Sequence, residues 1–147
     1  MKTAIVYHSR HHENTRKLLD AIAARYEVTL IDATQTKDFD LTGFDLVGFA
    51  SGIYYSKFQQ SVLQFAERNL PRNKPVFFLY TCGIKREGYT RAIEAAVLEK
   101  SATVKGAFGC PGFNTFGPFK LIGGLAKGHP DQTDLDNAVR FFGKLVG

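Results

Sequence analysis

The feature that most constrains the fold is an alternation of short apolar runs with segments of helical period. Five runs have the length and composition of β-strands, and they cover residues 2–7, 27–32, 44–50, 76–80 and 103–109. Apolar residues recur every three or four positions after residue 14 and in residues 58–68, 89–100 and 133–142. Strands that alternate with helices predict right-handed βαβ units, and therefore a parallel α/β sheet, doubly wound, with helices on both faces.

The apolar pattern within the strands predicts where each lies in the sheet. Residues 44–50 and 76–80 are almost continuously apolar, as expected of strands that are buried on both faces. Residues 27–32 alternate apolar and polar side chains, which is typical of a strand near an edge. We therefore expect the runs at 44–50 and 76–80 to be central in the sheet.

Polar residues predict where the first and last helices begin. Asn14 or Thr15 is expected to cap the first helix, because both residue types accept hydrogen bonds from free backbone N–H groups. Thr133 with Asp136 three residues later resembles a capping box and is expected to open the last helix.

Length and composition limit the class of protein. A chain of 147 residues predicts one domain, residues 1–147. No window reaches about 18 continuous apolar residues, so we expect no membrane span. Two cysteines do not make a disulfide framework, and no signal segment precedes the first strand, so a cytoplasmic location is expected.

The predicted topology places three unusual loops at one edge of the sheet. Ligands of open parallel sheets bind outside the carboxyl ends of the strands, where the strand order reverses. Residues 9–15, 51–57 and 81–87 each follow a predicted strand and fall at that edge. We expect them to form one binding site.

The first loop has the composition of a phosphate site. It leads into a helix N-terminus, whose free N–H groups and dipole favour an anion. Ser9, Asn14 and Thr15 can donate further hydrogen bonds, and Arg10 adds positive charge. An ordinary capped turn that binds nothing is the alternative.

A metal site is the other alternative for the first loop. It would use a cluster of His8, His11, His12 and Glu13. These residues lack the His-Glu-x-x-His spacing on a helix that zinc proteases need. We therefore expect no metal there.

The second and third loops have the composition of a site for a flat ring. Tyr54 and Tyr55 in the second loop can stack on a heterocycle, although one of them could instead close the core. Gly83 in the third loop lets backbone N–H groups approach the polar edge of a ring. Cys82 and Cys110 each follow a strand, which leaves open both a redox pair and two structural thiols.

These residues resemble those of the flavodoxin family, small electron carriers that bind FMN. The phosphate loop of some small relatives is similar to Ser-x-His-His-Gly-Asn-Thr, and here the loop has glutamate, Glu13, in place of the glycine. The resemblance covers essentially the whole chain and implies a flavodoxin-like sheet of five strands in the order 2-1-3-4-5. Residues 110–119 also resemble these relatives, but no chemistry is assigned to them.

The resemblance implies a set of FMN-binding residues from the three loops. They are Ser9, Arg10, His11, His12, Glu13, Asn14 and Thr15 of the first loop, Ser51, Gly52, Ile53, Tyr54 and Tyr55 of the second, and Thr81, Cys82 and Gly83 of the third. Since the chain has no tryptophan, Tyr54 is expected to stack on the isoalloxazine.

Three functions fit this prediction. The first is an FMN-binding electron-transfer protein, which needs no catalytic acid or base, and we predict no catalytic residue. The second is an FMN-dependent oxidoreductase that reduces quinones or similar acceptors with NADH or NADPH. The third is a binding module that has lost flavin. A yellow purified protein would exclude the third.

The charge distribution sets this chain apart from typical flavodoxins, which are acidic. The net charge is +5, and residues 46–130 contain 11 Lys or Arg against 4 Asp or Glu. Lys57, Lys85 and Arg86 lie in the loops expected around the ring, which favours an acidic redox partner or an anionic substrate. No nucleic-acid-binding motif is found, so no nucleic acid is expected as partner. Both a monomer and a homodimer are compatible with the sequence.

Overall fold

The computed structural model describes residues 1–10, 13–113 and 126–147. Within these ranges the strands are β1 (Thr3–His8), β2 (Thr29–Asp32), β3 (Leu46–Tyr54), β4 (Lys57–Phe58), β5 (Pro75–Cys82) and β6 (Thr103–Pro111). The helices are α1 (Asn14–Ala23), α2 (Gln60–Asn69), α3 (Arg91–Leu98) and α4 (Gln132–Val146). In the described part of the chain, no helix has both the length and the apolar character that crossing a bilayer requires.

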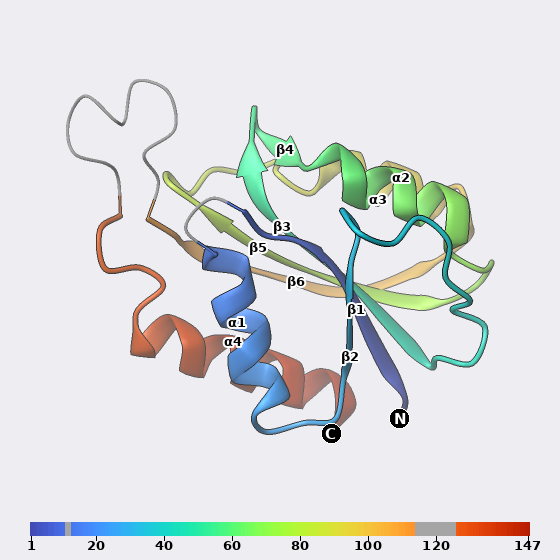
Figure 1. Cartoon of the computed structure of the whole chain (residues 1–147), viewed down its shortest axis with the longest axis horizontal. Coiled ribbons are helices and arrows are strands. Elements are labelled where there is room, and N and C mark those ends of the chain that lie inside the picture. Colours follow the sequence, from blue (N-terminus) through green and yellow to red (C-terminus); the bar gives the residue numbers. More distant parts are fainter. Residues whose placement is uncertain (11–12, 114–125) are drawn as a thin grey trace.

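The sheet has the predicted doubly wound parallel topology (Figure 1). Its five main strands are parallel and lie in the order β2-β1-β3-β5-β6, which confirms the predicted order 2-1-3-4-5. A short additional strand, β4, pairs antiparallel with the end of β3. The order in which successive strands are added to the sheet reverses at β1, because β2 lies on one side of it and β3 on the other. The switch point of the sheet is therefore at the carboxyl ends of β1 and β3.

The antiparallel hairpin of β3 and β4 was not predicted from the sequence. Its two-residue turn consists of Tyr55 and Ser56, which have φ angles of 50° and 65°. Two-residue hairpins with two positive φ angles usually use Asn-Gly or a similar pair, which the sequence lacks here. Because β3 forms this hairpin with β4, it extends beyond Ala50, the predicted end of the strand, to Tyr54.

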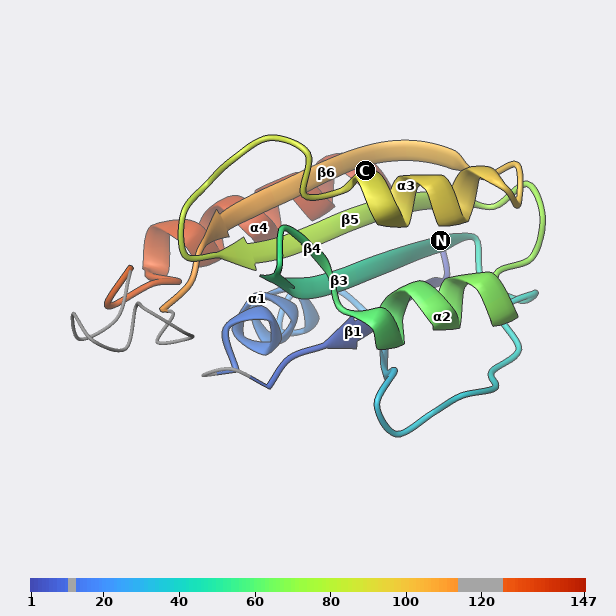
Figure 2. The same cartoon turned by 90° about the horizontal axis from the view of Figure 1, so that it is seen from above.

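Helices cover the two faces of the sheet in pairs (Figures 1 and 2). Helices α2 and α3 lie on one face, and α1 and α4 lie on the other. Phe49 and Phe78 are completely buried in the core on the α2 and α3 side, whereas Phe77 and Phe142 are buried in the core on the other side. The central position of β3 and β5 and the edge position of β2 agree with the apolar patterns of these strands.

The start of α1 differs from the predicted cap. The N-cap residue is Glu13, which has a left-handed backbone (φ 55°, ψ 28°), and its side chain makes no capping hydrogen bond. Asn14 and Thr15 already belong to the first turn and are buried. The prediction that one of them caps α1 was therefore wrong, and their side chains are left for other contacts.

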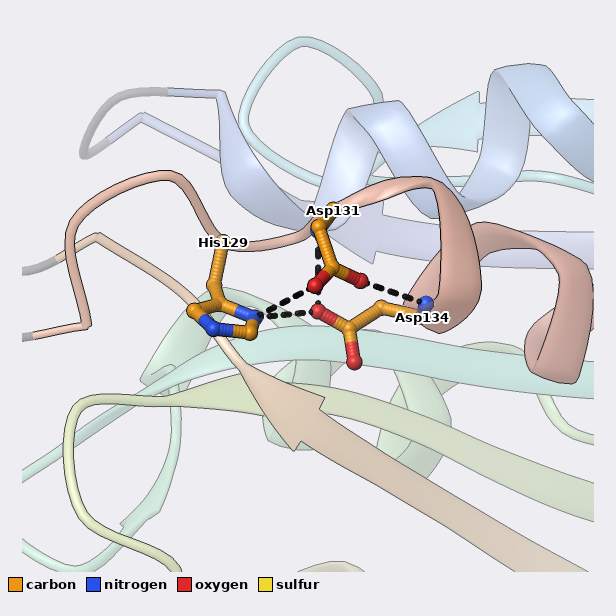
Figure 3. Close-up of side chains that lie close together, drawn as sticks. All are labelled: His129, Asp131 and Asp134. Carbon is orange, nitrogen blue, oxygen red and sulfur yellow. Dashed lines mark hydrogen bonds and ion pairs between the residues drawn. The ribbon is translucent and has the colours of Figure 1, made fainter.

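The start of α4 also lies elsewhere than predicted (Figure 3). Its capping box uses Asp131 and Asp134, not Thr133 and Asp136. The Asp134 N–H donates to Asp131 Oδ1 at 2.9 Å, and the Asp131 N–H donates to Asp134 Oδ2 at 2.9 Å. Aspartate at the N-cap carries a full charge at the positive end of the helix dipole, which favours the earlier start.

Candidate functional site

A pocket lies at the carboxyl ends of β1, β3 and β5, where the topology predicts a ligand. It brings together residues of all three predicted loops. Its lining consists of His8, Ser9, Arg10, Asn14, Thr15, Gly52, Ile53, Tyr54, Thr81, Cys82, Gly83 and Gly112. Ten of these were predicted as site residues from the sequence; His8 and Gly112 were not.

A pair of hydroxyl groups forms the floor of this pocket. Thr15 Oγ1 in α1 and Thr81 Oγ1 in β5 are joined by a buried hydrogen bond of 3.1 Å. Gly52 in β3 lies against them, because a Cβ at this position would be 3.8 Å from Thr81 Oγ1 and 4.0 Å from Thr15 Oγ1. The absence of a side chain at Gly52 keeps the two hydroxyl groups accessible from the pocket.

Asn14 supplies the pocket with a buried acceptor. Its Nδ2 donates to the carbonyl oxygen of Phe113 at 2.7 Å, and this bond fixes the orientation of the amide. Asn14 is 6% exposed, and its Oδ1 has no hydrogen-bond partner among the residues that the structure describes. A buried acceptor without a partner costs about 1–3 kcal/mol, so this oxygen favours a ligand that carries a donor.

Gly112 forms the wall of the pocket next to Asn14. A Cβ at Gly112 would lie 2.8 Å from Asn14 Nδ2 and 3.0 Å from Thr81 Cβ, which is too close for any other residue. The Gly112 N–H donates to the carbonyl oxygen of Cys82 at 2.9 Å, which ties the end of β6 to β5. In the sequence, only the resemblance of residues 110–119 to flavodoxin relatives pointed to Gly112, and no chemistry was assigned to that stretch.

The rest of the first loop surrounds the N-terminus of α1. Ser9 Oγ accepts a hydrogen bond from the Arg16 N–H at 3.1 Å, and the proton of the Ser9 hydroxyl can still be donated to a ligand. Arg10 is exposed at the pocket edge. Glu13 is exposed and lines a separate hollow outside the loop, so it faces away from the pocket floor. His11 and His12 lie outside the described residues.

The second loop places its two tyrosines differently. Tyr54 is half-buried and lines the pocket, and its ring lies 3.3 Å from the Cβ that Gly52 lacks. Tyr55 is 83% exposed and does not line this pocket; it lines a neighbouring open hollow. Ser51 is fully buried, and its Oγ accepts from the Gln59 N–H at 3.0 Å, so this side chain supports the hairpin.

Two buried thiols, Cys82 at the start of the third loop and Cys110 in β6, point to opposite faces of the sheet. Cys110 pairs in register with Thr81, not with Cys82, and side chains alternate along a strand. Cys110 accordingly packs beside Leu18 and Ala138 on the α1 and α4 face. Burial raises the pKa of Cys82 to about 11 and that of Cys110 to about 12, so both stay protonated near neutral pH. This arrangement does not support a redox pair.

His8 lines both the pocket and the neighbouring hollow. Its Nδ1 is 2.7 Å from Ser61 Oγ in α2. Burial and, next, the charge of Arg10 lower the pKa of His8, so the ring is neutral at pH 7. The alternation of β1 could have located it, since His8 follows Ala4 and Val6 on the α2 face of the sheet.

A second polar cluster lies near the end of β6 (Figure 3). His129, Asp131 and Asp134 offer ligand atoms within 4.8 Å of one another. The carboxylates already accept the hydrogen bonds of the α4 capping box, and His129 Nδ1 lies 2.6 Å from Asp134 Oδ2. The cluster is joined to the pocket wall because the Phe113 N–H donates to the His129 carbonyl oxygen at 2.8 Å. It therefore closes the α4 cap and supports the backbone that Asn14 contacts.

Comparison with known proteins places the chain in a family. The family model for the flavodoxin domain matches residues 4–114. An uncharacterized protein of Methanocaldococcus jannaschii is 33% identical over 143 residues, which cover 96% of this chain and 95% of that protein.

Solved structures of flavodoxins share the fold. The flavodoxin of Streptococcus pneumonia TIGR4 has a TM-score of 0.68 at 14% identity, covering 99% of this chain and 98% of that one. Oxidised Flavodoxin 2 from Bacillus cereus has a TM-score of 0.65 at 19% identity, covering 96% and 94%. The strand order, the position of the pocket and the match over residues 4–114 agree, and the chain belongs to the flavodoxin family.

Proposed function

We propose that this protein binds FMN non-covalently in the pocket at the carboxyl ends of β1, β3 and β5 and transfers electrons with it. The observation that carries the proposal is the convergence of three loops on hydrogen-bonding groups that suit a phosphorylated polyol. The Thr15 and Thr81 hydroxyls are donors or acceptors, and Asn14 Oδ1 is a buried acceptor without a partner in the described part of the chain. Family membership supports the same ligand.

The phosphate end of FMN is proposed to lie at the N-terminus of α1. The N-cap residue, Glu13, makes no side-chain capping bond, no acidic residue occupies the first turn, and Ser9 Oγ accepts from the Arg16 N–H. The remaining first N–H groups of α1 and the positive end of its dipole therefore favour an anion. Ser9 and Arg10 stand beside these groups and can add a hydroxyl donor and a positive charge.

The chain between phosphate and ring carries hydroxyl groups that suit Asn14. A ribityl hydroxyl can donate to Asn14 Oδ1, which a phosphate dianion cannot do because it offers only acceptors. Gly112 has no side chain, which lets Asn14 and Thr81 pack close to the end of β6, since a Cβ there would meet both. The residues present therefore fit a ligand with both a phosphate and a polyol.

The ring end is proposed to lie between the second and third loops. Tyr54 can stack on the isoalloxazine, and the backbone around Gly83 can reach its polar edge. FMN supplies the redox chemistry when bound. The chain contributes binding, orientation and partial exclusion of water.

An electron carrier fits the titratable groups of the pocket better than a turnover enzyme. The pKa of His8 is lowered, mainly by burial, and the pKa of Cys82 is raised by burial to about 11. The Cys82 thiol therefore stays protonated near neutral pH and cannot act as a general base there. An FMN-dependent quinone reductase is the second candidate, because an open hollow lined by His8, Tyr54 and Phe58 adjoins the pocket and offers a place for a second substrate.

Flavin analysis tests both proposals. The native protein is purified, its flavin is released by acid and identified by chromatography, and the reduction of a quinone by NADH or NADPH is measured. Bound FMN without steady-state turnover supports the carrier. Bound FMN with rapid turnover favours the reductase, and a protein that neither contains nor takes up flavin contradicts both.

A further inference from the structure

Four exposed cations belong to the three loops that form the proposed FMN site and are called here the basic rim. They are Arg10, Lys57, Lys85 and Arg86. Arg10 and Lys57 line the same hollow beside the pocket. Lys85 and Arg86 follow Gly83 of the pocket lining after one residue, Ile84. The charge of Lys85 reaches the ends of β5 and β6, where it opposes the larger effect of burial on the pKa of both thiols.

Glu13 and Asp32 line a hollow together with Arg10 but form no ion pair with it, so they offset its charge only in part. Among the described residues, no ion pair or side-chain hydrogen bond involves any of the four. Arginines elsewhere do have structural partners: Arg16 pairs with Asp20 at 2.9 Å, and Arg68 pairs with Asp38. Glu87 is the one acidic residue within the third loop. The rim therefore presents a positive field to a molecule that approaches the site.

Two exposed apolar side chains lie within this positive surface. Tyr55 is 83% exposed and lies two residues before Lys57 in the second loop, and Ile84 is 42% exposed and directly precedes Lys85 in the third loop. The positive φ of Tyr55 in the tight hairpin turn holds its side chain at the tip, away from the core. Apolar anchors inside a charged ring are the usual composition of a protein-binding surface.

We propose that the basic rim, together with Tyr55 and Ile84, docks an acidic redox protein whose electron-transfer centre lies beneath its acidic surface. This proposal rests on the proposed function, because docking here places a partner at the mouth of the flavin site. Complementary charge selects the partner and speeds its encounter. A second copy of this chain does not fit, since its own rim carries the same charge.

Small anions and nucleic acids fit the surface less well. A small anionic substrate would be held by the charges alone and would leave the exposed side chain of Ile84 without a role. Nucleic-acid sites need a row of phosphate contacts, whereas the four rim cations are divided among three loops. An acidic protein uses both the charges and the apolar centre.

Cytochrome c offers a matched pair of test partners. The native protein is basic, and succinylation of its lysines makes it acidic while the haem stays the same. Each ferric haem takes up one electron and becomes ferrous. Two haems therefore oxidise one fully reduced FMN, and the proton of the anionic reduced flavin is released to solvent. The rate constant is measured by stopped flow at several salt concentrations.

We expect the reduced holoprotein to react faster with succinylated than with native cytochrome c at low salt, by roughly tenfold or more. The rate with the acidic form should fall as salt increases, and the rate with the basic form should rise. Lys85→Glu and Lys57→Glu should each reduce the preference. Lys105→Glu is the control, because it changes the net charge equally near the amino end of β6.

The apolar centre is tested by Ile84→Ser. This change should slow the reaction with succinylated cytochrome c at least twofold, while the rate with ferricyanide, which is anionic but small, stays within error. Equal slowing with both oxidants would contradict a protein-docking surface.

A flavin-independent measurement separates this proposal from the proposed function. Calorimetric binding of succinylated cytochrome c to the protein without FMN should be weakened by Lys85→Glu and not by Lys105→Glu. Binding with this pattern but no bound flavin would retain the surface and contradict the FMN proposal. Equal effects of the two variants, or a preference for native cytochrome c, would overturn the surface. The proposal would also be overturned if duplex DNA bound more tightly than succinylated cytochrome c and Lys85→Glu abolished that DNA binding.

Discussion

Thr15 and Thr81, 66 residues apart in the sequence, share a buried hydrogen bond of 3.1 Å between their hydroxyl oxygens. This bond joins the first turn of α1 to the end of β5, and Gly52 of β3 lies against it. Three loops that are distant in the sequence therefore meet on one pair of hydroxyl groups. This junction gives the proposed FMN site its floor.

Replacing Thr15 by Ala tests the phosphate end of the site. We expect FMN to bind roughly 10- to 100-fold more weakly, because a hydrogen bond to a charged group contributes about 1.5–3 kcal/mol. Riboflavin, which has no phosphate, should lose much less. Titration of flavin fluorescence measures both ligands, with Thr103→Ala at the exposed start of β6 as the control. Equal weakening of FMN and riboflavin would count against the site.

Tyr54 is expected to stack on the isoalloxazine and to lower the potential of the second reduction step. An electron-rich ring against the flavin disfavours its anionic reduced form, and an aromatic contact contributes about 0.5–1.5 kcal/mol beyond burial. Tyr54→Ala should raise this potential and change the quenching of flavin fluorescence. Tyr55→Ala is the matched comparison, since Tyr55 points away from the pocket. If only Tyr55→Ala changes both quantities, the wrong tyrosine has been assigned.

Glu13 has the left-handed backbone that glycine adopts most easily, with φ 55°. Left-handed backbone costs a residue with a side chain about 1–2 kcal/mol, so Glu13→Gly should stabilise the protein without FMN by about 1 kcal/mol. Urea unfolding measures this difference. Glu13→Gln keeps the strain and should change the stability little. A less stable Gly variant would contradict this interpretation of the loop.

The charge of Glu13 is also expected to affect the affinity for FMN. Glu13 is exposed and faces a hollow outside the pocket, so its repulsion of a bound phosphate is weakened by solvent. Glu13→Gln should tighten FMN up to roughly tenfold at low salt, and the gain should shrink as salt screens the charge. Calorimetry that shows weaker FMN binding by the Gln variant at every salt concentration would refute this account.

Gly112 tests the role of the β6 end in the site. A Cβ here would lie 2.8 Å from Asn14 Nδ2, so Gly112→Ala should displace the Asn14 amide and weaken FMN by tenfold or more, at about 1.4 kcal/mol per decade. Gly43→Ala is the control, because its Cβ would meet only the flexible Lys2 ammonium at 3.9 Å. FMN affinity that is equal in both variants would show that Asn14 does not contact the ligand.

His129 predicts a pH dependence of stability. The hydrogen bond to Asp134 raises the pKa of His129 above its ordinary value of 6.5. The stabilisation is therefore fully present below pH 6.5 and is lost as the pH rises through the higher folded pKa. NMR titration of the four histidines should show a raised pKa for His129 that Asp134→Asn abolishes, while the Asn side chain can still accept the capping hydrogen bond. A His129 pKa at or below 6.5 would contradict the pairing.

The order of the main strands was predicted from the resemblance to flavodoxins, whereas the apolar patterns indicated which strands are central and which lies near an edge. The hairpin at Tyr55 and Ser56 could not be predicted, since its positive φ angles are imposed by the tertiary structure on residues that do not favour them. The capping box of α4 was misplaced for a different reason. Thr133 and Asp136 have the right spacing, but Asp131 and Asp134 have it too, and the sequence pattern does not rank them.

The site was predicted from the rule that ligands bind at strand ends, and its details depended on contacts between distant residues. The rule located Thr15 and Thr81, but their hydrogen bond follows from the register of β5 beside β3. Gly112 and His8 were missed for different reasons. Gly112 matters because it has no Cβ, which a sequence pattern does not reveal. His8 was considered as the last residue of the first strand and not as part of the site.

The most direct test of the central claim is a titration of the flavin-free protein with FMN and with riboflavin. Flavin fluorescence follows the binding, and calorimetry gives the stoichiometry. One FMN should bind per chain, and FMN should bind more tightly than riboflavin, because only FMN can place a phosphate at the N-terminus of α1. Equal affinity for the two flavins, or no binding of either, would contradict an FMN site at the carboxyl ends of β1, β3 and β5.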